Sequence, residues 1–189
     1  MLVVPYLLST AHAGSSSVAE HPRPYAGHPV FDLRVGVDRL DDLSHPYLCA
    51  QGLPTGWLAI EACGTGAGVL HHDDAPDMAH FRAKGKVLDV GEGRLNAALM
   101  PGLGFAEVQR TADRAGFQFG EAKEPDPIEA AGAEASLSLQ GRYWVDPGAR
   151  TYVTGVIDGG AALIPAAPDV FGRGGPVVPF ASVTVGFGF

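Results

Sequence analysis

Apolar and polar side chains alternate along the last segment of the chain, Pro179–Phe189. Successive side chains of a β-strand point to opposite faces, so this alternation predicts a strand with one apolar face and one small, polar face. The apolar face carries Ala181, Val183, Val185, Phe187 and Phe189. The other face carries Ser182, Thr184, Gly186 and Gly188.

The same alternation recurs upstream and predicts an antiparallel all-β chain of eight strands. The seven further strands are Val30–Arg39, Gly56–Leu70, Ala79–Val90, Arg94–Val108, Ala115–Ala122, Ala133–Val145 and Ala149–Asp158. Pro101 interrupts the fourth of these strands, where its missing backbone N–H predicts a bend or bulge. Asp146-Pro147-Gly148 predicts a tight turn before the last of them. A short helix is the alternative for Ile128–Ala135, which is rich in good helix formers.

One face of these strands is almost entirely aliphatic, whereas the other face carries charges of both signs. The charged positions are Asp32, Arg34, Glu61, Arg82, Lys84, Lys86, Arg94, Glu134 and Arg142. A transmembrane barrel would turn the aliphatic face to lipid and pair these charges inside its lumen. Eight strands enclose a space only wide enough for side chains, so we predict lumen ion pairs and no open pore. A water-soluble barrel of the lipocalin kind inverts this arrangement, and the alternation alone fits both.

The composition suits short strands joined by turns and excludes one class of partner. The 189 residues include 26 Gly and 15 Pro, which punctuate strands and disfavour long helices. The net charge of −8 leaves no basic surface for phosphates, which excludes nucleic acid as a partner. No apolar run reaches about 18 residues, so no transmembrane helix is predicted.

The start of the chain has the pattern of an export signal. Leu2–Leu8 is a short apolar stretch, and Ala11-His12-Ala13 has the small-x-small form of a cleavage site. A buried first strand is the alternative. We therefore predict an export segment at residues 1–13, a flexible leader at residues 14–29 that is rich in Ser, Gly and Pro, and one β-barrel domain at residues 30–189.

The reactive side chains predict a disulfide but no active site. An exported chain enters an oxidising compartment, so Cys49 and Cys63 can pair there, the alternative being two buried thiols. The dense group His71-His72-Asp73-Asp74, with Asp77 and His80, could hold a cation. Neighbouring residues in a turn rarely converge on one ion, so we predict no metal and no cofactor. No catalytic motif is present, and we predict no enzyme activity.

The export segment, the PGLGFAEV sequence of Pro101–Val108 and the closing VTVGFGF sequence of Val183–Phe189 together carry a resemblance. The chain resembles the small, porin-like, eight-stranded β-barrels of bacterial outer membranes. The resemblance covers roughly Val30–Phe189 and implies a single up-and-down transmembrane barrel in the outer membrane of a diderm bacterium. Aromatic residues near the predicted strand ends suit the membrane boundary; they are Trp57, Phe105, Tyr143, Trp144, Phe187 and Phe189.

The resemblance also implies partners and a role. Val183, Val185, Phe187 and Phe189 would form the C-terminal signal read by the barrel assembly machinery. Outer-membrane lipid would surround the wall, and the role would be structural or a surface interaction with a partner that the sequence does not identify. Two alternatives stay open: a soluble exported lipocalin-like barrel that binds a small apolar ligand, and a barrel enzyme that acts on lipid through a polar cluster on its outer rim.

Overall fold

The computed structural model describes residues 30–39, 45–67, 70–71, 76–110, 119–120, 128–145, 151–172 and 174–189. The predicted export segment and leader lie outside these residues. The elements are β1 (Val30–Asp38), β2 (Tyr47–Leu53), β3 (Leu58–Gly64), β4 (Asp77–Gly85), β5 (Leu88–Glu92), β6 (Leu95–Gln109), β7 (Glu129–Trp144), β8 (Tyr152–Leu163), α1 (Ala167–Phe171) and β9 (Val177–Gly188).

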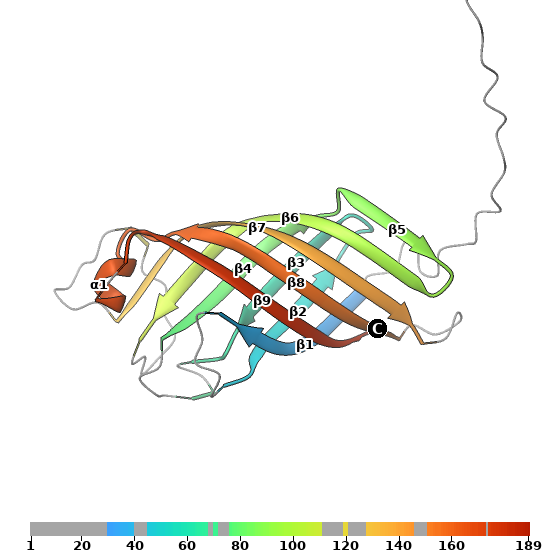
Figure 1. Cartoon of the computed structure of the whole chain (residues 1–189), viewed down its shortest axis with the longest axis horizontal. Helices are drawn as coiled ribbons and strands as arrows, with labels where there is room; N and C mark the ends of the chain where they lie inside the picture. The colour runs from blue at the N-terminus through green and yellow to red at the C-terminus, as the bar shows by residue number, and fades with distance from the viewer. Residues whose placement is uncertain are drawn as a thin grey trace, which may run out of the picture.

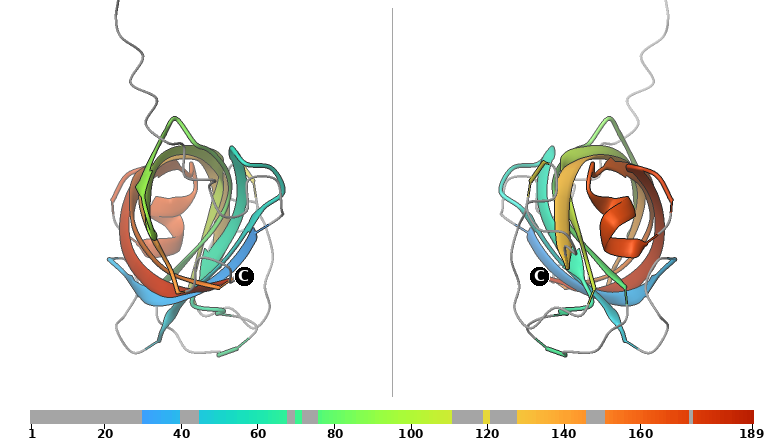
Figure 2. Two further views of the ribbon diagram at one scale, coloured as in Figure 1. Left: turned by 90° about the vertical axis from the view of Figure 1, so that its right-hand side faces the viewer. Right: turned by 90° about the vertical axis from the view of Figure 1, so that its left-hand side faces the viewer.

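The strands form one antiparallel sheet that closes into a barrel of eight strands, with β5 as an extra strand (Figures 1 and 2). The order in the wall is β4-β3-β2-β1-β9-β8-β7-β6, and a β4–β6 pairing closes the ring. With β5 set aside, each strand of the ring pairs with the strands before and after it along the chain. β1 also pairs with β9. The prediction of an all-β, antiparallel, eight-stranded barrel is therefore confirmed.

The extra strand arises from a break opposite Pro101. β4 pairs with β6 from Gly102 onward, whereas β5 pairs with β6 only up to Leu99. Pro101 has no N–H to donate, so the sheet can part at this level without losing a hydrogen bond from that residue. The β5–β6 hairpin continues past the rim of the barrel, at the end where the chain terminates (Figure 1). The single predicted strand Ala79–Val90 is thus two strands.

Two further strand predictions differ from the structure. β2 was not among the predicted strands, although it completes the wall between β1 and β3. The predicted strand Ala115–Ala122 lies outside the described residues except for Phe119 and Gly120, and Phe119 forms only an isolated bridge to Ala131.

The segment Ile128–Ala135 lies in β7 from Glu129 onward and is not helical. The predicted turn at Asp146-Pro147-Gly148 lies outside the described residues.

The two ends of the barrel differ in their connections. At the end that holds the start of β1 and the end of β9, the strands are joined by residues 54–57, 93–94 and 145–151. At the opposite end the connections are longer and comprise residues 39–46, 65–76, 110–128 and 164–176. The helix α1 belongs to this second end and lies across the mouth of the barrel (Figure 2). Beneath it, Val170 packs with Met78, Val108, Ile164 and Phe180 in an apolar cluster.

Candidate functional site

The inner face of the wall is polar and charged. Alternate positions on nearly every strand are buried, and the buried polar side chains include Asp32, Arg34, Gln51, Glu61, His80, Arg82, Lys84, Glu134, Ser138, Gln140, Arg142, Thr154, Asp158 and Thr184. Isolated buried charges are costly, so side chains of this kind persist only when they pair with one another. The interior contains such a network, with acidic and basic groups close together.

Glu61 on β3 is the centre of the network. Its carboxylate accepts hydrogen bonds from Arg34 on β1, from Arg82 Nε at 2.9 Å and from Lys84 Nζ at 2.6 Å on β4. All four side chains are at most 1% exposed. One carboxylate therefore receives donors from two other strands, which ties the wall together from the inside.

A second carboxylate extends the network across the lumen. Asp158 on β8 lies 2.5 Å from Arg82 Nη2 and 3.3 Å from Lys84 Nζ, and it also accepts a hydrogen bond from Ser138 Oγ at 3.0 Å. Beside it, Glu134 on β7 lies 2.6 Å from His80 Nδ1. These contacts join β4 to β7 and β8 through the interior.

Toward the end of the barrel where β1 begins and β9 ends, neutral polar and aromatic side chains join the network. Asp32 accepts a hydrogen bond from Arg34 Nε at 2.8 Å and another from the Tyr152 hydroxyl at 3.1 Å. Gln140 receives a hydrogen bond at 3.0 Å from Arg142, whose guanidinium lies 5.2 Å from the centre of the Tyr152 ring. From Asp32 to α1, side chains fill the interior in three layers: polar and aromatic, charged, and apolar.

Seven of the nine predicted lumen charges lie inside the barrel, and the other two lie elsewhere. Lys86 is half-buried past the end of β4 and lies 3.0 Å from Asp89. Arg94 is exposed in the β5–β6 turn and donates a hydrogen bond to the Val145 carbonyl. Both residues stand outside the ring because the wall parts after Gly85.

Glycines on the inner face make room for the long basic side chains. A Cβ on Gly104 would lie 2.0 Å from the Phe81 carbonyl oxygen and 2.9 Å from Arg82 Cβ, and one on Gly186 would lie 1.9 Å from the Leu33 carbonyl oxygen and 2.8 Å from Arg34 Cγ. A Cβ on Gly102 would lie 2.5 Å from Ser136 Oγ and 3.1 Å from Lys84 Cγ. Real Cβ atoms rarely approach other atoms so closely, so the adjacent strand backbone and the basic side chains together require glycine at Gly104 and Gly186.

The outer face of the wall is apolar and exposed. Its large side chains that are more than a third exposed are Phe31, Leu33, Val35, Val37, Leu48, Ile60, Leu95, Leu103, Leu137, Leu139, Tyr143, Val153, Ile157, Leu163, Val177, Val183, Val185 and Phe187. In the outward register of the eight ring strands, charged residues occur only beside the long connections, and they are Asp77, Glu107 and Glu129. An apolar surface of this extent far exceeds the patches that monomeric soluble proteins leave exposed.

Aromatic side chains lie near both edges of this apolar surface. Trp57, Phe187 and Phe189 are exposed at the end where β1 begins and β9 ends, and Tyr143 is nearly half exposed there. Toward the other end, Phe105 stacks on Phe81 with ring centres 5.1 Å apart. Trp144, which the sequence pattern grouped with these residues, is instead buried and packs on Tyr152 inside the barrel.

The two cysteines form a disulfide, as predicted. Cys49 of β2 and Cys63 of β3 are directly opposite each other in the strand pairing, and both side chains are buried. The bond therefore staples two neighbouring strands of the wall from the inner face.

The described residues contain no group of three or more His, Cys, Asp or Glu side chains placed to hold a metal ion. The members of the predicted His and Asp cluster that can be placed lie apart. His80 is inside the barrel, whereas His71 contacts Thr65 in the β3–β4 connection. His72, Asp73 and Asp74 lie outside the described residues.

Comparisons with family models, with curated protein sequences and with solved structures give no match to this chain. In the described part of the chain, no helix has the length and apolar character needed to cross a bilayer. The porin-like outer-membrane family, the export signal and the cellular location accordingly stay predictions.

Proposed function

We propose that this protein is an integral β-barrel of the outer membrane of a diderm bacterium, with a structural or surface-interaction role and no enzyme activity. Its lumen is filled by side chains and does not serve as an open pore. Outer-membrane lipid would contact the wall, and the barrel assembly machinery would read Val183, Val185, Phe187 and Phe189. The observation that carries the proposal is the distribution of polarity across the wall.

A lipid environment accounts for that distribution. Inward positions hold paired ions, as at Glu61 and Arg82, while outward positions on the same strands, such as Ile60 and Ala83, are apolar. In water the exposed aliphatic surface would be unfavourable, by roughly 25 cal/mol per Å². In a bilayer the same surface is matched to hydrocarbon, and the charges remain shielded inside.

The dimensions and the connections of the barrel add support. Tyr143 pairs with Leu95 on β6, ten residues before Phe105, and this span corresponds to about 25 Å along the membrane normal for a strand tilted by about 40°. That height matches the apolar band of outer-membrane barrels, which aromatic residues flank. Short turns at the end where β1 begins and β9 ends, and longer connections at the other end, are the arrangement typical of such barrels.

The filled lumen supports a non-conducting role. Arg34, Arg82 and Lys84 reach from the wall to carboxylates within the barrel, and α1 covers one mouth. An eight-stranded barrel leaves no spare width around such side chains. The surface available to a partner is then the end formed by the long connections.

Two measurements test the proposal. Carbonate washing of membranes from cells that express the full chain should leave the protein in the pellet. The purified protein in detergent should migrate faster on a gel without heating than after boiling, because a closed barrel stays folded. Release by carbonate would contradict the proposal and favour the soluble lipocalin-like alternative. Passage of ions through planar bilayers that contain the folded protein would contradict the filled lumen.

A further inference from the structure

A groove with a volume of about 590 Å³ crosses the outer face of β1 to β4. Its floor consists of the small residues Ala50, Ala62, Gly64 and Ala79, which lie in outward positions of three adjacent strands. Large aliphatic side chains flank this floor. A second hollow, of about 790 Å³, lies on the outer face of β5 to β9, so the apolar surface is not uniformly filled. The volume of the groove over β1 to β4 falls within the range of ligand pockets, about 300–1,000 Å³.

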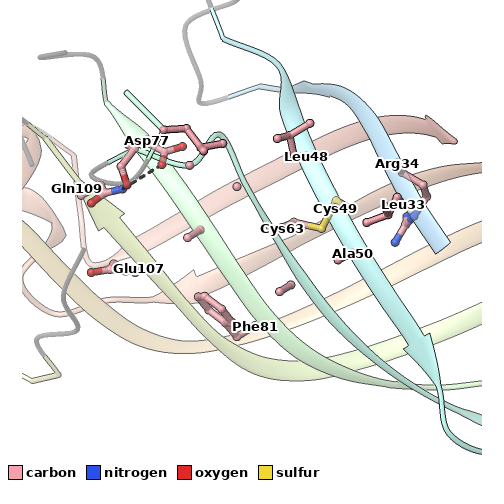
Figure 3. A pocket seen from close by; sticks show the side chains of 16 residues that line it. Leu33, Arg34, Leu48, Cys49, Ala50, Cys63, Asp77, Phe81, Glu107 and Gln109 are labelled. Atoms are coloured by element: carbon pink, nitrogen blue, oxygen red, sulfur yellow. Dashed lines mark hydrogen bonds between the residues drawn. A yellow bond between two sulfur atoms is a disulfide. The ribbon is translucent and has the colours of Figure 1, made fainter. Parts of the chain in front are cut away.

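The walls of the groove are also apolar. Leu33 and Leu48 flank it on one side, and Phe81 flanks it on the other (Figure 3). Leu33, Ala50, Ala62 and Phe81 are successive partners across the strands, so the groove runs over a continuous sheet surface. Such a surface matches a flexible hydrocarbon chain and offers it no polar group along its length.

One end of the groove differs, because Asp77, Glu107 and Gln109 line it there (Figure 3). Each of these side chains is at least nine-tenths buried, and each has one buried oxygen without a hydrogen-bond partner: Asp77 Oδ1, Glu107 Oε1 and Gln109 Oε1. The Gln109 amide donates a hydrogen bond at 3.1 Å to the other Asp77 oxygen, which fixes the pair. Unpaired buried acceptors are costly, and no donor from the described residues reaches these three oxygens.

Among the described residues that line this end, the charged side chains are all acidic. The Glu107 carboxyl lies within electrostatic reach of those of Asp77 and Glu129, and none of the three forms an ion pair with a described residue. A ligand that bound here would have to bring positive charge and N–H donors. An anionic head group would be repelled by the same carboxylates.

We propose that the groove binds one acyl chain of a membrane lipid whose head group ends in a primary ammonium. The chain lies over Ala62 and Ala79, and the ammonium donates its three N–H bonds to the three unpaired oxygens of Asp77, Glu107 and Gln109. The ammonium matches the site in charge and in the number of hydrogen bonds, because it carries three donors and no acceptor while the site offers three unpaired oxygens. This inference rests on the proposed membrane location, since lipid must reach the outer face.

The test is native mass spectrometry of the full chain in detergent with three lipids of identical acyl chains. Their head groups are ethanolamine, choline and glycerol, so the first has N–H donors, the second has the same charge without donors, and the third is anionic. We expect the ethanolamine lipid to be retained about tenfold better than the other two, as the loss of charge-assisted hydrogen bonds predicts. Glu107→Gln should reduce that preference to less than about threefold.

Ala62→Phe should lower retention of all three lipids by about tenfold by filling the groove. Ala135→Phe is its control, because Ala135 is also exposed on the outer face but lies on β7. Equal retention of the three lipids by the unmodified chain, or equal effects of the two Phe substitutions, would overturn the proposal. Carbonate resistance and heat-modifiable migration are measured on the same samples. A barrel that passes both but shows no head-group preference refutes the groove and leaves the membrane location intact.

Discussion

Arg82 Nη2 on β4 lies 2.5 Å from Asp158 Oδ2 on β8, although β6 and β7 separate these two strands in the wall. The contact therefore spans the lumen. This ion pair links two strands that are not adjacent in the wall and holds them at a fixed separation. A contact between neighbouring strands cannot do the same.

Asp158→Asn should destabilise the barrel by about 3–5 kcal/mol, because it leaves Arg82 and Lys84 in the interior with one carboxylate fewer. Urea unfolding in detergent, followed by the loss of the fast-migrating gel form, measures the change. Glu92→Gln on the exposed β5 is the matched control and should stay within about 0.5 kcal/mol. In the double variant with Arg82→Met the two costs should be non-additive by about 0.5–3 kcal/mol. Additive costs would show that the pair does not act as a unit.

Gly104→Ala should cost about 1–3 kcal/mol, because the added methyl group would lie 2.0 Å from the Phe81 carbonyl oxygen and 2.9 Å from Arg82 Cβ on β4. Gly85→Ala offers a close comparison, since nothing lies within 4 Å of a Cβ at that position. The unfolding midpoint of each variant in urea reports the difference. Equal midpoints for the two variants would argue against the close approach of Gly104 to β4 on the inner face.

The sequence predicted best those strands whose inner face is charged. β1 and β4 alternate aliphatic residues with Asp32, Arg34, Arg82 and Lys84, so the two faces were visible in the pattern. β2 was missed because its inward residues include Tyr47, Cys49 and Leu53, which are apolar as its outward Leu48 is. Where the interior is itself apolar, alternation disappears and a strand has no distinct signature.

Two central members of the network escaped prediction for related reasons. Asp158 was placed at the end of a predicted strand, because the Gly-Gly-Ala-Ala sequence that follows has no alternation, yet β8 continues to Leu163. His80 was grouped with the His and Asp residues of the preceding turn. It stands two residues before Arg82 and four before Lys84, so the alternation of the strand places it on the same inner face. The partners themselves could not be predicted, because they depend on which strands face each other across the lumen.

Replacing both Cys49 and Cys63 by Ala should lower the free energy of unfolding by about 3 kcal/mol, as expected for a loop of this length in the unfolded chain. The two residues are separated by 14 positions in the sequence. Reducing the unmodified protein should produce the same shift in its urea midpoint. Titration of free thiols under denaturing conditions should find two more after reduction than before, and an unchanged count would refute the disulfide.

The long connections should lie outside the cell. An epitope tag inserted after Gly120 should be accessible to antibody on intact cells, because barrels of this class place their longer loops at the outer surface. The same tag inserted after Gly56, in the short connection between β2 and β3, should be detected only after permeabilisation. Flow cytometry on both strains measures the contrast, and the reverse result would contradict the proposed orientation.

Leu137→Arg provides the sharpest test of what surrounds the wall. Leu137 is 52% exposed on the outer face of β7, midway between the two ends of that strand. In a bilayer the charge should cost about 2–4 kcal/mol at this depth, measured by urea unfolding from lipid vesicles. Leu95→Arg is the control, because Leu95 is 63% exposed at the tip of the β5–β6 hairpin, where it pairs with Glu92 and the cost should be at most about 1 kcal/mol. If the outer face met water, both substitutions would be tolerated alike, since an exposed arginine is well solvated and surface changes rarely exceed about 0.5 kcal/mol. A difference between the two variants that appears in vesicles therefore depends on hydrocarbon around Leu137.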